Sequence, residues 1–418
     1  MAQLADDCFA VGSASASVDA ALASLADRVV TLPDAETIGL RGALGRVLAE
    51  DIVAGLSVPP HDNSAVDGFA VRHADLDPAA PTLLPVTGRA AAGHPLARPI
   101  SPGTAIRIFT GAPMPAGADT VMMQEDCRIE GDHVRINPGI KPGANRRRAG
   151  EDIRAGATVL TRGTRMRAQE IGVAASLGRT QISAYRRLRV AVLSTGDELC
   201  EPGTPLPAGS IHDSNRHMLM ALLDGLGLAI TDLGIQPDGP ETIRRVLGEA
   251  AASHDVVMSS GGMSTGDEDH VKAAVESQGN LHFWRLAIKP GRPVALGQIG
   301  RVPFVGLPGN PVAAMVTFLI LARPMLLQLQ GARYVRPTSF PVRADFAHGK
   351  KPGRREYLCA TVARDASGQL VAAKYPRDGA GILTALAESQ GLVVLDEQLT
   401  SLERGDLVDY LPFTEVMP

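Results

Sequence analysis

The chain has 418 residues, more than one hydrophobic core usually supports, so we expect several domains. Hydrophobic residues make up 45% of the chain and charged residues 21%, which is typical of folded globular proteins and excludes disordered or collagen-like architecture. A net charge of −4 and an aromatic content of 4% argue against a nucleic-acid partner, which would need a basic surface and stacking rings.

The cysteines and the apolar segments indicate the compartment. Four widely spaced cysteines (Cys8, Cys127, Cys200 and Cys359) exclude a disulfide framework and a zinc ribbon, and they fit a reducing environment. The N-terminus lacks the basic and apolar regions of a secretory signal. The apolar stretch 312–322 is followed by Arg323 and Pro324 and is shorter than the ~20 residues that span a bilayer, so we expect a buried helix. The sequence predicts a soluble cytoplasmic protein without a membrane partner.

The first half of the chain contains a helical segment, a β-rich segment and a basic segment, in that order. Helical spacing over 18–30 ends before Pro33, and short apolar runs broken by Gly and Pro over 55–140 predict a small β-rich unit. Residues 141–189 hold twelve Lys or Arg against three acidic residues. Such a belt is usually a solvated or subunit-facing surface, and recruitment of an anionic ligand is the alternative.

Strands and helices alternate over 189–330, which predicts a mostly parallel sheet covered on both faces. The last element of this region is a long apolar helix, for which Asn310 suits the N-cap and Pro311 the first turn. The tail, 336–418, returns to short β-like runs and predicts a small barrel or sandwich.

Three loops at the expected carboxyl ends of these strands are rich in glycine: STGDEL at 194–199, SSGGMSTGDED at 259–269 and GLPGNP at 306–311. Ligands of open α/β sheets bind at this edge. Free backbone N–H groups beside helix N-termini hold anions there. We therefore expect an anion-binding site formed by these loops rather than three unrelated turns.

Carboxylates accompany the same loops: Asp197, Glu198, Asp238, Asp267, Glu268 and Asp269. They would repel a phosphate unless a divalent cation lay between, and Mg²⁺ takes one or two carboxylates together with phosphate oxygens. The alternative is that some of them, Asp267 and Glu268 above all, stabilise helix N-termini. Arg285, Lys289 and Arg292 surround the turn LAIKPGRP, where they could clamp an anion.

Other standard sites are excluded by their missing motifs. The sequence contains no G-x-x-x-x-G-K-[ST] phosphate loop and no G-x-G-x-x-G after the first strand of the α/β region. Its ten histidines form no H-x-x-x-H or H-x-H pair, and no G-x-S-x-G is present, so neither zinc nor a serine nucleophile is supported.

Seven motifs, in order along nearly the whole chain, together resemble the MoeA family of molybdopterin molybdenumtransferases, which is related to the C-terminal domain of gephyrin. They are PHDNSAVDGFA (60–70), FTGAPMPAGAD (109–119), RRAGEDI (147–153), STGDEL, SSGGMSTGDED, IKPGRP and GLPGNP. The resemblance implies a multidomain fold: a discontinuous helical linking domain (1–54 and 141–184), a β-rich domain (55–140), a doubly wound α/β molybdopterin-binding domain (185–331) and a C-terminal β-barrel (332–418).

The resemblance also implies the reaction. Molybdate would be inserted into adenylylated molybdopterin with the help of Mg²⁺, and AMP would be released. Family members are homodimers whose clefts lie between the α/β domain of one subunit and the second domain of the other. The resemblance further implies transient contacts with other cofactor-biosynthesis proteins and apo-molybdoenzymes.

Site residues follow from the matching motif positions. The family's catalytic groups match Asp67, Glu198, Asp238, Asp269 and Lys289, and Glu198 and Asp269 would hold the metal. Substrate contacts are expected from Thr110, Asp152, Gly196, Gly261, Gly262, Ser264, Arg285, Pro290, Arg292, Pro308, Gly309, Asn310 and Arg355, with Arg355 facing the oxyanion from the barrel.

The sequence departs from the family at three positions. Arg285 stands where lysine is found, Ala380 lies in a loop that usually reads Gly-Ser-Gly, and Ala313 follows PGNPV where serine is frequent. Arg285 keeps the charge with a different hydrogen-bond geometry. The two alanines remove hydroxyls from the expected oxyanion contacts.

Two other functions are compatible with parts of this pattern. One is a scaffold that keeps the fold without turnover, although all the family's acids are present here. The other is an enzyme for a different nucleotide-linked substrate, against which the SAVDGFA and FTGAP motifs argue because they belong to the full-length family.

Overall fold

The computed structural model describes residues 17–261, 270–291 and 293–417. The chain forms two compact units. The first holds the chain up to Ala49, the segment Gly163–Met166 and the chain from Ile182 onward, and the second holds Glu50–Arg162 and Arg167–Gln181. The four domain boundaries expected from the sequence are finer than this division and stay a prediction.

A six-stranded sheet with the order β16-β13-β17-β21-β20-β18 forms the centre of the first unit. β13 and β17 pair in parallel with all their neighbours. β20 is antiparallel to both of its neighbours, β18 and β21. The mostly parallel sheet is therefore confirmed. Its strands are β13 (Arg189–Thr195), β16 (Ala229–Gln236), β17 (Val256–Ser260), β18 (Gly279–Arg285), β20 (Pro293–Ile299) and β21 (Val302–Leu307).

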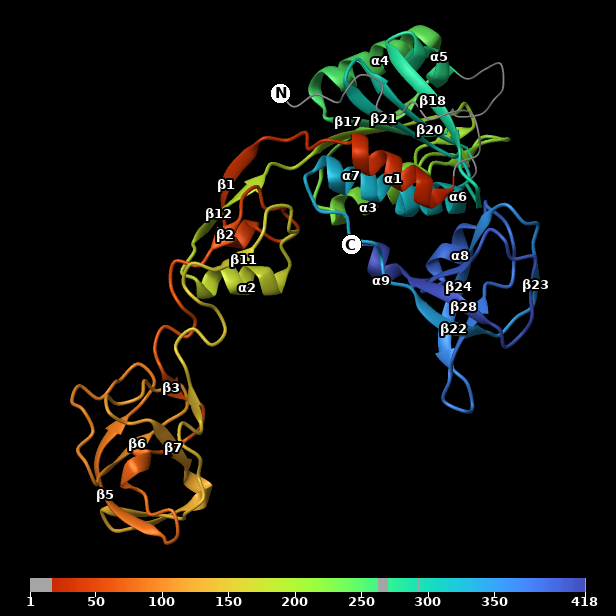
Figure 1. Ribbon diagram of the computed structural model, residues 1–418. Coiled ribbons are helices and arrows are strands. Elements are labelled where there is room, and N and C mark those ends of the chain that lie inside the picture. The colour runs from red at the N-terminus through yellow and green to blue at the C-terminus, as the bar shows by residue number, and fades with distance from the viewer. Residues whose placement is uncertain (1–16, 262–269, 292, 418) are drawn as a thin grey trace. The chain divides into compact units, whose positions relative to one another are not determined.

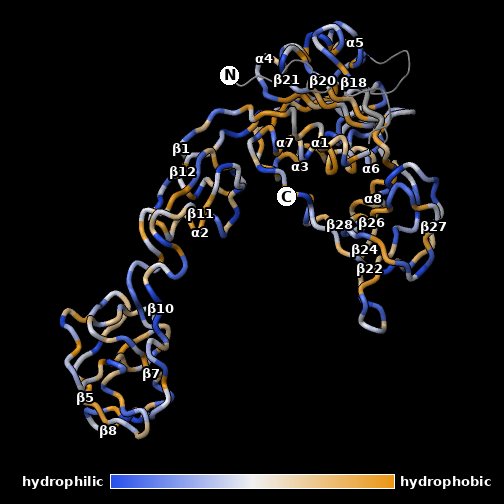
Figure 2. The backbone as a smooth tube through the Cα atoms, in the orientation of Figure 1, coloured by the Kyte–Doolittle hydropathy of each residue, from blue (hydrophilic) through white to orange (hydrophobic). Residues whose placement is uncertain are grey.

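Helices cover both faces of this sheet (Figure 1). One apolar core lies under α1 (Val18–Arg28), α3 (Asn215–Gly225), α6 (Pro311–Thr317) and α7 (Arg323–Leu329). A second core lies under α4 (Pro240–Ser253) and α5 (His270–Glu276). Figure 2 shows hydrophobic residues gathered where these helices meet the strands. The expected α/β fold with two covered faces is thus confirmed.

The apolar helix after Asn310 is longer than the sequence suggests. α6 continues through a π-helical segment, η4 (Phe318–Ala322), into α7, so Arg323 and Pro324 do not end it. The resulting helix, Pro311–Leu329, has 19 residues and is apolar enough to cross a membrane, but 78% of it is buried within the protein. The expectation of a buried core helix is confirmed.

The C-terminal sheet has the order β19-β24-β25-β22-β28-β26, and an additional pairing of β24 with β26 closes it into a barrel. Its strands are β19 (Ile288–Lys289), β22 (Phe340–Ala344), β24 (Arg355–Arg364), β25 (Leu370–Lys374), β26 (Gly391–Leu395) and β28 (Leu407–Pro412). β19 lies between β18 and β20 in the chain, but it pairs with β24 and so belongs to the barrel rather than to the α/β sheet.

Smaller elements complete the first unit. They are β1 (Ala35–Gly39), η1 (Leu40–Gly42), β12 (Gln181–Tyr185), β14 (Leu199–Cys200), β15 (Ile211–His212), β23 (His348–Gly349), α8 (Leu383–Ala387), β27 (Ser401–Leu402) and α9 (Phe413–Val416). β1 pairs with β12, although β12 begins at the boundary of the second unit.

The second unit is built on a six-stranded sheet with the order β7-β4-β6-β5-β9-β8, so the β-rich texture of this region is confirmed. Its apolar residues form two small cores. The elements are β2 (Ile52–Val53), β3 (Asn63–Ser64), β4 (Gly68–Val71), η2 (His73–Asp75), β5 (Thr82–Ala90), β6 (Ala105–Ile108), β7 (Thr120–Met123), η3 (Gln124–Asp126), β8 (Cys127–Glu130), β9 (His133–Ile136), β10 (Arg146–Arg147), β11 (Thr158–Leu160) and α2 (Ala168–Ser176).

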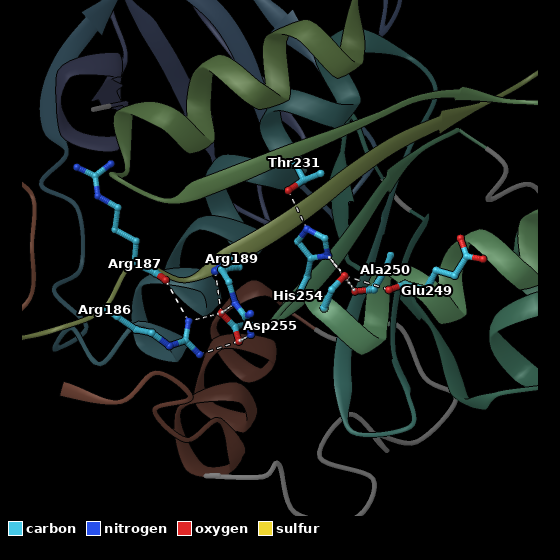
Figure 3. A network of polar contacts seen from close by, with 9 residues as sticks. Arg186, Arg187, Arg189, Thr231, Glu249, Ala250, His254 and Asp255 are labelled. Carbon is cyan, nitrogen blue, oxygen red and sulfur yellow. Dashed lines mark hydrogen bonds and ion pairs between the residues drawn. The ribbon is translucent and has the colours of Figure 1, made fainter. Parts of the chain in front are cut away.

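An ion-pair network ties the start of β13 to the residue before β17 (Figure 3). The guanidinium groups of Arg186 and Arg189 donate to the nearly buried carboxylate of Asp255 at 2.6–3.3 Å, and so does the backbone N–H of Arg189 at 2.8 Å. Burial alone would raise the pKa of Asp255. The hydrogen bonds from Arg186 and Arg189 outweigh it and hold this pKa well below its usual value.

We expect Asp255→Asn to lower the free energy of unfolding by about 1.5–3 kcal/mol at neutral pH, the usual contribution of hydrogen bonds to a charged group. Because the folded-state pKa is depressed, the carboxylate stabilises the protein above its unfolded-state pKa of ~3.9, and this stability is lost as the pH falls below that value. The difference between variant and wild type should therefore shrink below about pH 4. Urea unfolding measures it, with the exposed Asp224→Asn as control, and a difference independent of pH would contradict the assignment.

Candidate active site

The carboxyl ends of β13, β17 and β21 meet at one edge of the sheet. At Gly261, where φ is +83°, a Cβ atom would lie 2.7 Å from the carbonyl oxygen of Thr195, so only glycine lets the loop after β17 approach the end of β13 this closely. A Cβ at Gly309 would lie 3.9 Å from the Cα of Gly261. The described start of the loop 259–269 therefore adjoins the end of β13, and the loop 306–311 lies beside it at Gly261.

The side chain of Asn215, at the start of α3, joins the same loops. Its amide donates to the hydroxyl of Ser260 at 3.0 Å and to the carbonyl of Gly309 at 2.7 Å. Within the described part of the chain, the hydroxyls of Ser194, Thr195 and Ser259 are buried with no hydrogen-bond partner. Buried polar groups are nearly always hydrogen-bonded, so unpaired hydroxyls beside this edge are candidate ligand contacts.

Carboxylates gather around the loop after β13. Burial and then the charge of Asp197 raise the pKa of Asp238, with a further contribution from Glu198, while His270 acts in the opposite direction. The carboxylate of Glu198 folds back over Gly196, where a Cβ atom would lie 2.6 Å from it. The structure therefore brings Asp197, Glu198 and Asp238 together, as expected from their strand-end positions.

These carboxylates are suited to a magnesium ion that is shared with a substrate. Across residues 17–261, 270–291 and 293–417, no three His, Cys, Asp or Glu side chains form a metal cage. Mg²⁺ does not require one, since it is usually held by one or two carboxylates with phosphate oxygens and waters. Burial is the first cause of the raised pKa of Asp238 and the negative charge of Asp197 the second, and a cation bound at this edge would relieve the second.

Lys289 lies at the KPG turn, in β19, and its ammonium nitrogen is 3.3 Å from the carboxylate of Glu356. Glu356 is almost completely buried, and Nε2 of His348 lies 3.0 Å from the same carboxylate. The Lys289 side chain is about half exposed (51%), so its ammonium group is anchored by Glu356 and still reaches solvent. Such a cation can receive an oxyanion.

Arg355 is directed elsewhere. It pairs with Asp19 of α1 at 2.9 Å and with Glu397 at 3.2 Å. In β24 its side chain leaves on the face opposite to that of Glu356, because successive strand residues alternate. The structure therefore does not bring Arg355 to the ammonium group of Lys289, which argues against the expected contact of Arg355 with an oxyanion there.

Arg355 instead lines a cavity of about 680 Å³ away from the carboxylate cluster. Its walls are mainly apolar and come from α1, the helix 311–329, the segment 334–341 and the barrel. None of the residues at the ends of β13, β17 and β21 lines it. This cavity is therefore separate from the candidate active site.

The start of the helix 311–329 contacts the barrel loop 378–381. The backbone N–H of Val312 donates to the carbonyl of Ala380 at 2.9 Å, and a Cβ at Gly381 would lie 3.8 Å from Oδ1 of Asn310. Asn310 occupies the N-cap position and Pro311 the first turn, as expected, but the Asn310 side chain makes no capping hydrogen bond.

In the second unit, Asp67 and Thr110 form a pair. The backbone N–H and the hydroxyl of Thr110 both donate to Oδ1 of Asp67 at 2.8 Å. These bonds, the backbone one first, lower the pKa of Asp67, and the charge of Arg107 acts in the same direction. Asp67 is therefore an ionised carboxylate at neutral pH. The third expected residue of this unit, Asp152, is exposed.

Comparisons with known proteins decide the family. Residues 16–178 match the MoeA N-terminal region (domain I and II), 191–328 a probable molybdopterin binding domain, and 341–413 the MoeA C-terminal region (domain IV). A molybdopterin molybdenumtransferase from Haemophilus influenzae is 36% identical over 96% of this chain and 99% of that protein. The chain belongs to the MoeA family.

Other MoeA relatives agree over most of their length. Molybdopterin molybdenumtransferase 2 from Mycobacterium tuberculosis is 36% identical over 88% of this chain and 93% of the relative. The crystal structure of the molybdopterin biosynthesis MoeA protein from Pyrococcus horikoshii aligns with a TM-score of 0.80 at 29% identity, over 96% of this chain and all of that one. The chain is accordingly an enzyme of the transferase class.

Part of the expected MoeA site lies outside the described residues. Gly262, Ser264, Asp269 and Arg292 are not described, and neither is the side chain of Arg285. Their roles stay predictions, as does the clamp of three cations around the KPG turn. Pro290 follows Lys289 through a cis peptide bond.

Three contributors were missed by the sequence reasoning. Glu356 and His348 lie in the barrel region, far along the chain from Lys289, and only the pairing of β19 with β24 brings them to it. Asn215 resembles any polar residue in the first turn of a helix. The sequence carries no signal for these contacts.

Proposed function

We propose that this chain inserts molybdenum from molybdate into adenylylated molybdopterin and releases AMP, with Mg²⁺ as the cofactor. The observation that carries the proposal is the cluster of Asp197, Glu198 and Asp238 beside the glycine-rich ends of parallel strands. Relatives named molybdopterin molybdenumtransferase over nearly the whole chain support the same reaction.

Different groups of this chain would bind the phosphates, hold the metal and move a proton. Backbone N–H groups of the loops that contain Gly196, Gly261, Gly262 and Ser264, and of the loop Pro308–Asn310, would hold the phosphates of the substrate. Glu198 and Asp269 would hold Mg²⁺, which neutralises negative charge as AMP leaves. Asp238, whose pKa is raised, could hold or move a proton nearby.

Lys289 would receive the molybdate oxyanion, with Pro290 shaping the turn and Arg285 and Arg292 as further cations. Its anchor, Glu356, is buried, and the ion pair of 3.3 Å holds the ammonium group in a fixed place. Arg355 faces Asp19 and Glu397, so any contribution of this arginine to substrate binding would be indirect. Ala380 and Ala313 offer no hydroxyl, which leaves the oxyanion to charged groups.

Thermal unfolding with ligands tests the binding part of this proposal. AMP with Mg²⁺ should raise the unfolding temperature, and molybdate should raise it further, because a ligand that binds only the folded state stabilises it. Sulfate at equal ionic strength is the control for a nonspecific anion. The absence of any shift with AMP and Mg²⁺ would contradict an adenylyl site.

We further propose that the protein acts as a cytoplasmic homodimer in which Asp67, Thr110 and Asp152 complete the site of the other subunit. Asp67 is an ionised acid whose Oδ2 accepts no hydrogen bond in the described structure, so it is available to a ligand. Transient contacts with other cofactor-biosynthesis proteins and apo-molybdoenzymes would deliver the product. No nucleic-acid or membrane partner is part of the proposal.

Mixing two inactive variants tests the shared site. Asp67→Asn and Glu198→Gln dimers should each be nearly inactive, whereas heterodimers formed after subunit exchange should regain up to about half of the activity per dimer, because one of the two sites then carries both native acids. Light scattering measures the oligomer and AMP release measures recovery. A fully active monomer, or exchange without recovery, would contradict the arrangement.

A further inference from the structure

Arg107, in β6, contacts both chain segments that carry the Asp67–Thr110 pair. Its Nη1 donates to the carbonyl of Gly68, the residue after Asp67, at 3.1 Å. Its guanidinium carbon lies 4.8 Å from the ring centre of Phe109, the residue before Thr110. One side chain thus holds the neighbours of both members of the pair.

Further contacts fix the orientation of the guanidinium. Its Nη2 donates to Oε1 of Gln124, whose own backbone N–H donates to the carbonyl of Asp67 at 3.1 Å. The guanidinium also lies 5.0 Å from the centre of the buried Phe69 ring. Phe69 and Arg107 are direct partners in the pairing of β4 with β6, so the sheet register places them face to face. A planar, always charged group suits stacking and forked hydrogen bonds together.

We infer that Arg107 is a positioning residue for the Asp67–Thr110 pair: it forms a clamp, with a hydrogen bond to the carbonyl of Gly68 on one side and a stack on the ring of Phe109 on the other, and so keeps Oδ1 of Asp67 on the Thr110 donors. Oδ2 of Asp67 is then presented to the substrate in one orientation. The inference rests on the proposed function where Asp67 is taken to act on the substrate. The clamp itself is a property of the second unit alone.

Arg89 provides a matched control. It stacks on the same Phe109 ring, at 4.6 Å, and lies beside Arg107 in the pairing of β5 with β6. It has the same charge and chemistry, yet it makes no hydrogen bond to Gly68 or Gln124. Loss of stacking and charge at the same ring can therefore be separated from loss of the clamp.

The first measurement needs no substrate. Hydrogen exchange of the full-length protein, followed by mass spectrometry, reports the protection of the Thr110 amide, which donates to Asp67. In Arg107→Ala, peptides that contain Thr110 should exchange about tenfold faster or more, whereas Arg89→Ala should leave them unchanged. Unchanged protection in Arg107→Ala, or equal loss in both variants, would overturn the inference.

The second measurement is kinetic. In Arg107→Ala the kcat of AMP release should fall about 10–100-fold, the usual cost of a misplaced reacting group, while KM for adenylylated molybdopterin changes less than about threefold. Arg89→Ala should keep the wild-type kcat, and a rise of KM alone in Arg107→Ala would overturn the positioning role. If Arg107→Ala does not fold, Arg107→Lys tests the positioning role instead. Its single ammonium group keeps the charge but cannot reach both acceptors, so we expect a smaller rise in Thr110 exchange and a smaller fall in kcat.

The proposed reaction and the positioning role of Arg107 can be tested separately. A wild-type protein that releases no AMP from adenylylated molybdopterin would remove the proposed function, while the exchange result would still decide whether Arg107 clamps the pair. An active wild type together with an unaltered Arg107→Ala variant would remove only the clamp.

Discussion

Replacing Glu198 by glutamine is expected to lower the rate of AMP release about 10²–10³-fold while the protein stays folded. Glu198 is exposed, and its carboxylate lies over Gly196 with no ion pair in the described structure. Glutamine has the same shape, so the change removes only charge. A folded variant that turns over slowly would show that the charge acts in catalysis rather than in stability.

A magnesium titration sharpens this test. If Glu198 holds Mg²⁺, the variant should need a higher Mg²⁺ concentration, and its binding of AMP without metal should be unchanged. Glu241→Gln is the matched control, since Glu241 is an exposed acid of α4 in a surface pair with Arg244. Wild-type turnover in Glu198→Gln, or equal loss in Glu241→Gln, would contradict the assignment.

Replacing Lys289 by glutamine should raise the KM for molybdate about 10–100-fold, because a hydrogen bond from a charged donor contributes about 1.5–3 kcal/mol. The change should leave the binding of adenylylated molybdopterin nearly intact. Lys289→Arg keeps the positive charge beside Glu356, so its KM for molybdate should rise much less than that of Lys289→Gln. The molybdate dependence of AMP release measures both variants.

Two controls separate this effect from damage to the fold. Lys351→Gln removes an exposed lysine in the segment before β24 and should leave the molybdate dependence unchanged. Because Lys289→Gln takes one cation from the buried Glu356, its unfolding should be followed as well. An unchanged KM for molybdate in a folded Lys289→Gln would show that the oxyanion binds elsewhere.

Most of the architecture could be predicted from local patterns. Alternating strands and helices over 189–330 specify a parallel sheet, and the acids after successive strands converge because parallel strands end at one edge. The sequence predicts a long apolar helix after Asn310, but not that it continues through Arg323 and Pro324. There α7 begins directly after η4, and Ala322, Pro324 and Met325 are buried.

The contacts that could not be predicted join segments far apart along the chain. Glu356 reaches Lys289 only because β19 leaves the α/β sheet and pairs with β24. The same pairing sends Arg355 to the opposite face, toward Asp19, which no motif indicates. Arg107 likewise acquires its role from the register of β4 with β6 rather than from its own sequence context.

The most direct test of the proposed reaction is the release of AMP from adenylylated molybdopterin by the purified protein, followed by chromatography with and without molybdate. With Mg²⁺ and molybdate present, one AMP should appear for each molybdenum incorporated into the pterin, and Glu198→Gln should nearly abolish both. Molybdenum incorporation without AMP, or AMP release that is indifferent to molybdate and to Glu198, would contradict the account.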